Sequence, residues 1–69
     1  MRRRRVTSSL ISSVGYAAET ATLEVELVDG TVYRYFAVPR RHAEELLAAE
    51  SPGRYFNEQI KPRYPFEKL

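Results

Sequence analysis

The strongest fold signal in this chain is TLEVELVDGTVYRYFAVP, residues 22–39. In residues 22–28, leucine and valine alternate with glutamate, and on a β-strand such alternation separates an apolar face from a polar one. Asp29-Gly30 is a strong signal for a hairpin turn. The β-branched and aromatic residues 31–37 are typical of a partner strand. Pro39 ends the sheet and can open a helix at its first position, so the segment predicts a β-hairpin followed by a helix.

The length of the hairpin loop decides which face carries Tyr33 and Tyr35. A two-residue loop places both rings on the face of the glutamates and turns Arg34 toward the apolar face. A three-residue loop, with Gly30 in the left-handed bulge position, pairs Val25 with Tyr33 and joins the rings to the aliphatic face. We favour the longer loop because it leaves Arg34 in water beside glutamates, whereas a buried unpaired guanidinium costs on the order of several kcal/mol. Core packing of the two rings is then favoured over an exposed stacking platform.

The rest of the chain adds one strand and two helices. Residues 8–18, SSLISSVGYAA, predict a first strand with an irregular start. Residues 40–50, RRHAEELLAAE, carry apolar positions at helical spacing, and Ser51 with the proline after it can begin a second short helix. Residues 62–69 are expected to be extended at the surface. This order predicts an α+β domain, with two short helices packed on one face of a three-stranded antiparallel β-meander.

Size and composition limit the class of protein. A chain of 69 residues forms one domain that buries only about 60% of its unfolded surface, so a dimer or a partner would help its stability. The absence of cysteine excludes disulfides and thiolate metal sites. No apolar run is long enough for a membrane span or a signal peptide. We therefore expect a soluble, cytoplasmic protein that contacts no membrane.

The net charge of +2 depends on a run of four arginines, Arg2 to Arg5. Without this run, seven basic residues stand against nine acidic ones, so the high pI alone does not indicate a nucleic-acid surface. Adjacent arginines repel one another and bury nothing apolar. We expect a disordered basic arm over residues 1–6 and a single folded domain over residues 7–69.

An ordered set of short motifs resembles the KTSC domain. The motifs are Ser8, Ser9 and Ile11; Gly30, Tyr33 and Tyr35; Val38-Pro39; and SPGRYFNEQI over residues 51–60. The resemblance covers roughly residues 7–64. The family is named for its occurrence at the C-terminus of some lysyl-tRNA synthetases, and it also occurs as small stand-alone bacterial proteins. The resemblance implies RNA binding as a candidate role, because of the synthetase context.

Interleaved rings and cations point to the same role. Proteins bind single-stranded nucleic acid with aromatic rings that stack bases and cations that follow phosphates. The arginine arm could also bind phosphates as a polycation with steep salt dependence. The predicted nucleic-acid-binding residues are Tyr33, Arg34, Tyr35, Arg54, Tyr55, Lys61, Arg63 and Tyr64.

Residues suited to catalysis are scarce. His42 is the only histidine, and we expect it to be a surface residue of the helix, because one histidine without cysteine cannot complete a metal site. Glu44 and Glu45 are neighbours on a helix and diverge by about 100°, so they do not form a facing acid–base pair. Asn57 is expected to bind the backbone of a nearby loop. We predict a non-enzymatic binding module without metal or cofactor, whose partner is RNA or another nucleic acid. The alternative is a protein-interaction module, with a homodimer as one form of it, that uses an open sheet edge.

Overall fold

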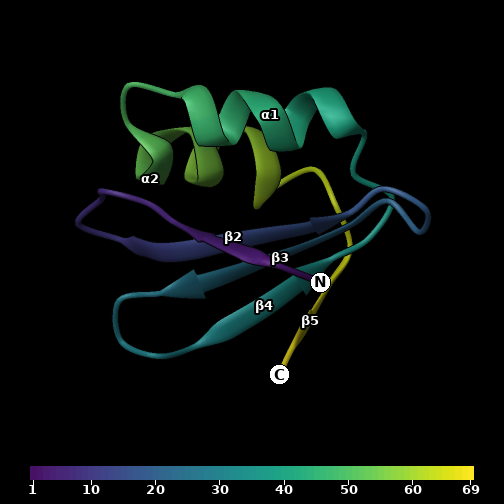
Figure 1. Cartoon of the computed structure of the whole chain (residues 1–69), viewed down its shortest axis with the longest axis horizontal. Coiled ribbons are helices and arrows are strands. Elements are labelled where there is room, and N and C mark those ends of the chain that lie inside the picture. The colour runs from purple at the N-terminus through teal and green to yellow at the C-terminus, as the bar shows by residue number, and fades with distance from the viewer.

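A five-stranded antiparallel sheet carries all of the helices on one face in the computed structural model, which describes residues 1–69 (Figure 1). The strands lie side by side in chain order: β1 (Arg3–Arg5), β2 (Ile11–Ala17), β3 (Thr22–Leu27), β4 (Val32–Tyr35) and β5 (Phe66–Lys68). The helical layer consists of α1 (Arg40–Ala48), α2 (Pro52–Tyr55) and the π-helical turn η1 (Phe56–Ile60). The α+β class is confirmed. No helix is both long and apolar enough to cross a membrane.

The prediction of three strands was wrong, because short edge strands extend the meander on both sides. β1 pairs with β2, and β5 pairs with β4, each in antiparallel register. The sequence predicts that residues 3–5 belong to a disordered arm. In the structure these residues form β1. Neighbouring arginines on a strand point to opposite faces, which separates their charges, and Arg3 contacts the carboxylate of Glu24 at 2.8 Å.

The hairpin has the three-residue loop that the charge argument favoured. Val25 lies opposite Tyr33, and Leu23 lies opposite Tyr35. The Leu27 amide donates to the Thr31 carbonyl at 2.8 Å, which closes the loop. Gly30 adopts φ of 93°, a left-handed conformation that glycine reaches without a steric penalty. The two tyrosines therefore share the aliphatic face, as predicted.

The core lies between this face of the sheet and the helices. Tyr35, 2% exposed, meets the ring of Phe56 from η1 edge-on, with ring centroids 5.6 Å apart. The buried apolar residues are Ile11, Val14, Leu23, Val25, Tyr35, Val38, Ala43, Leu46, Phe56 and Ile60. Ser51 caps the start of α2 by accepting the Arg54 amide at 3.4 Å. The opposite face of the sheet carries no helix, so its side chains meet only one another and water.

Candidate nucleic-acid interface

The structure separates the central group of predicted site residues. Tyr35 is buried in the core, and Tyr33 is half-buried against Tyr35 and Phe66, with ring centroids 6.4 and 5.7 Å away. Arg34 lies on the other face of the sheet. There its Nε and Nη2 donate to Glu24 at 3.0 and 2.6 Å. These two rings and this cation cannot contact one nucleotide together.

The hydroxyls of Tyr55 and Tyr64 are bound to α1. Tyr55 donates to a carboxylate oxygen of Glu45 at 2.6 Å, and the Tyr64 hydroxyl is hydrogen-bonded to Nδ1 of His42. Burial, and then the bond to Glu45, raise the pKa of Tyr55 to about 12. His42, expected at the free surface of the helix, is half-buried in this contact. Both rings are half-buried, and their polar ends attach the segment after α1 to that helix.

The remaining predicted cations lie along and after the second helical segment. Arg54 is exposed, and its Nε donates to Glu58 one turn later at 3.2 Å. Lys61 and Arg63 are exposed and make no ion pair. Asn57, expected to bind the backbone of a loop, makes no side-chain hydrogen bond. The predicted interface therefore keeps two free cations but no exposed ring platform beside them.

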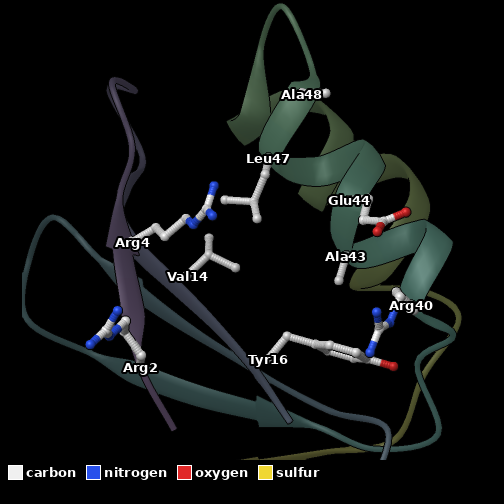
Figure 2. A pocket seen from close by; sticks show the side chains of 9 residues that line it. All are labelled: Arg2, Arg4, Val14, Tyr16, Arg40, Ala43, Glu44, Leu47 and Ala48. Atoms are coloured by element: carbon white, nitrogen blue, oxygen red, sulfur yellow. The ribbon is translucent and has the colours of Figure 1, made fainter. Parts of the chain in front are cut away.

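A different set of arginines surrounds a groove between β1 and α1 (Figure 2). Its volume is about 520 Å³. Its walls carry Arg2 and Arg4 from the N-terminal segment and Arg40 from the start of α1. The complete lining is Arg2, Arg4, Val14, Tyr16, Arg40, Ala43, Glu44, Leu47 and Ala48.

The charge of this groove is strongly positive for its size. Its lining contains three arginines and a single carboxylate, that of Glu44. None of the three arginines takes part in any ion pair of the structure. Unpaired guanidinium groups keep all their donors available for an anion, and they match phosphate or carboxylate oxygens in pairs.

The floor of the groove is apolar and aromatic. Val14 and Tyr16 are two residues apart on β2, so they share the face below α1. The Tyr16 hydroxyl donates to the Val38 carbonyl at 2.6 Å, which fixes the ring, and the ring is partly buried against the core. In Figure 2, Arg40 and Tyr16 both project into the groove, and Arg4 approaches from the opposite wall. Sequence reasoning missed this site because it placed the arginine run in a disordered arm.

The polar motif residues at the start and end of the domain gather at a second groove of about 570 Å³. Ser8 Oγ accepts the amides of Leu10 and Ile11 at 3.1 and 3.2 Å, which shapes the entry to β2. A Cβ at Gly53 would lie 3.2 Å from the Cβ of Leu10, so glycine allows the start of α2 to pack against this turn. These motif residues are explained by the local backbone, and the groove contains no comparable group of free cations.

The chain belongs to the KTSC domain family, which matches residues 7–64. An uncharacterized protein of Stutzerimonas stutzeri (strain A1501) is 45% identical over 64 residues, covering 93% of this chain and 90% of that protein. The lysine–tRNA ligase of Nostoc punctiforme is 43% identical over 61 residues, which cover 88% of this chain but 11% of the ligase. A crystal structure of a KTSC domain protein from Yersinia pestis has a TM-score of 0.92 at 35% identity, covering 99% of this chain and 96% of that one. The family is therefore shown, as the motifs predicted.

Proposed function

We propose that this protein is a non-catalytic module that binds single-stranded nucleic acid, RNA in particular, in the groove between β1 and α1. The observation that carries the proposal is the set of three unpaired arginines around an apolar floor that includes one partly buried ring, Tyr16. The relation to part of a ligase that acts on tRNA supports RNA as the nucleic acid. Glu44 is the only carboxylate in the groove, so no second acid or base stands beside it for catalysis.

The chemistry of binding divides between the walls and the floor. Arg2, Arg4 and Arg40 would each bind a phosphate oxygen pair, which gives affinity without reading sequence. Tyr16 would stack one base, a contact worth about 1–3 kcal/mol. Its hydroxyl is already bound to Val38, so little ring motion is lost on binding. The expected preference is for a flexible single strand, with weak dependence on sequence.

The test is fluorescence anisotropy with a labelled single-stranded RNA in low salt. The groove variant carries Arg2→Gln, Arg4→Gln and Arg40→Gln. The matched control carries Lys61→Gln, Arg63→Gln and Lys68→Gln, which removes the same charge from exposed side chains that make no ion pair. We expect the groove variant to bind at least about tenfold more weakly than the control. No binding by the unsubstituted protein, or equal losses in both variants, would refute the groove as the site.

A second candidate function is self-association through β5. This edge strand is open, and Phe66, its first residue, and Leu69, which follows it, are 56% and 54% exposed. An open edge can accept a strand from another chain, and apolar side chains at the edge favour that contact. Light scattering tests this candidate: a concentration-dependent dimer that Phe66→Lys abolishes would support it, and a monomer at high concentration would exclude it.

A further inference from the structure

One row of residues runs in register across all five strands on the face without helices. Arg3 lies opposite Gly15, Gly15 opposite Glu24, Glu24 opposite Arg34, and Arg34 opposite Glu67. Glu24 is the centre of this row. Its two carboxylate oxygens accept from Arg3 at 2.8 Å and from Arg34 at 2.6 Å, and its side chain is 10% exposed. Glu24 therefore ties β1 to β3 and β4 through a nearly buried carboxylate, and Arg3 also has a longer contact with Glu26 of β3, at 3.9 Å.

Gly15 makes the contact between Arg3 and Glu24 possible. The two residues stand on strands separated by β2, a span of roughly 9 to 10 Å. A Cβ at Gly15 would lie 3.1 Å from Cγ of Arg3 and 3.0 Å from Cγ and Sδ of Met1. The stem of the arginine thus crosses β2 in the space that a side chain would occupy. Any larger residue at this position would obstruct the approach of Arg3 to Glu24.

Fixing Arg3 also fixes its neighbours. β1 is only three residues long, and its edge is open to solvent. Adjacent side chains on a strand point to opposite faces, so an Arg3 held on the open face leaves Arg2 and Arg4 to the other face, where both are among the residues that line the groove. A loose arm would spread these two guanidinium groups over many positions.

From this geometry we infer that Glu24 is a positioning residue of the groove, although it lies on the opposite face of the sheet. It holds β1 in register through Arg3, and so presents Arg2 and Arg4 to a phosphate backbone before the ligand arrives. The inference rests on the proposed function of the groove. Preorganised cations bind more tightly than disordered ones because less motion is lost on binding.

The positioning role of Glu24 predicts that Glu24→Gln weakens RNA binding, whereas the change of charge alone predicts stronger binding. Glu24→Gln removes a negative charge, which by electrostatics should strengthen the binding of RNA. If anchoring of β1 dominates, this variant binds RNA about three- to tenfold more weakly, since the arm must be ordered on binding. Glu67→Gln is the matched control, because Glu67 lies in the same row and contacts Arg34 at 3.7 Å but does not contact β1. The control should bind as tightly as the unsubstituted protein, or slightly more tightly.

The experiment combines RNA anisotropy with amide hydrogen exchange of the full chain without RNA. We expect faster exchange of the β1 amides in Glu24→Gln, with exchange of the β3 core amides less affected, and no change in Glu67→Gln. Arg3→Lys provides a second variant, which keeps the charge and the Glu24–Arg34 pair but loses the reach and fork of the guanidinium. It too should show faster β1 exchange and weaker binding.

Two results would overturn the inference. One is equal or tighter RNA binding by both Glu24→Gln and Arg3→Lys, and the other is unchanged β1 exchange in both. If the unsubstituted protein binds no RNA, the proposed function fails first, and faster β1 exchange would then leave Glu24 with a purely structural role. Weaker binding confined to these two variants, together with faster β1 exchange, would establish the positioning role.

Discussion

The substitution Gly15→Val should destabilise the protein when Arg3 is present and stabilise it when Arg3 is replaced by alanine. Glycine inside a strand is normally unfavourable, by roughly 0.5–1 kcal/mol relative to alanine, and β-branched residues are preferred there. Valine alone should therefore stabilise β2 by about 1 kcal/mol. In this protein the space above Gly15 contains the stems of Arg3 and Met1, so valine must displace them.

The magnitude follows from the contact that is lost. A charge-assisted hydrogen bond such as that from Arg3 to Glu24 contributes about 1.5–3 kcal/mol when partly buried. Subtracting the gain in strand preference leaves Gly15→Val destabilising by about 1 kcal/mol in the full chain. In an Arg3→Ala background the contact is already absent, so the same substitution should be stabilising by up to about 1 kcal/mol. Met1 is more than half exposed and can move aside.

Urea denaturation measures the effect of Gly15→Val in both backgrounds. The four proteins are the unsubstituted chain, Gly15→Val, Arg3→Ala and the double variant, all at one pH and ionic strength. For a domain of this size, 1 kcal/mol corresponds to a shift in Tm of about 4–8 °C, so thermal melts give an independent reading. The expected coupling between the two positions is about 2 kcal/mol, within the range for residues in contact. Equal effects of Gly15→Val in the two backgrounds would refute the role assigned to this glycine.

Further predictions concern the core, the hairpin, the helix contacts and the acid response. Leu46→Ala, at a fully buried position of α1, should lower the free energy of unfolding in urea by about 2–5 kcal/mol; a loss below 1 kcal/mol on that scale would contradict the packing. Gly30→Ala should cost about 1 kcal/mol because of the left-handed backbone, and a neutral effect in the same assay would contradict the bulged loop. In an ultraviolet titration of the tyrosines, the phenol of Tyr55 should ionise near pH 12, and this titration step should be absent in Tyr55→Phe. In Glu45→Gln the pKa of Tyr55 should be lower, because the bond to the Glu45 carboxylate is lost. Hydrogen bonds from two arginines lower the pKa of Glu24 below 4.5. The contribution of Glu24 to stability is therefore complete above that pH and is lost as the pH falls through the lowered value. The difference in unfolding free energy between the unsubstituted protein and Glu24→Gln should shrink on acidification. A difference independent of pH would contradict the ion pairs.

Local patterns were sufficient to predict the central part of the fold. The hairpin and its register followed from alternation in residues 22–28 and from the cost of burying Arg34, and both features are present. The helix from Arg40 followed from apolar spacing after Pro39. In each case the deciding interactions lie within about a dozen residues of one another, so a sequence reveals them directly.

The edge strands were not predictable in this way because long-range contacts form them. Residues 3–5 are all arginine and show no alternation of apolar and polar types. Their pairing depends on β2 and on Glu24, which is 21 residues away from Arg3. β5 likewise depends on pairing with β4. The groove arises only when β1 is placed beside α1, so Arg40 and Tyr16 could not be assigned to one site from sequence. Tyr55 and Tyr64 had been predicted to stack bases, but their hydroxyls meet α1 side chains that are distant in sequence.

The salt dependence of RNA affinity tests the central claim most directly. Each phosphate neutralised on a single strand contributes about −0.7 to the slope of log K against log salt concentration, so three groove arginines should contribute about −2. Anisotropy titrations between about 50 and 200 mM salt give this slope for the unsubstituted protein and for the two triple-glutamine variants. The groove account predicts that the slope falls in magnitude by about 2 in the Arg2, Arg4 and Arg40 variant and hardly changes in the Lys61, Arg63 and Lys68 variant. An unchanged slope in the groove variant would show that the phosphates bind elsewhere.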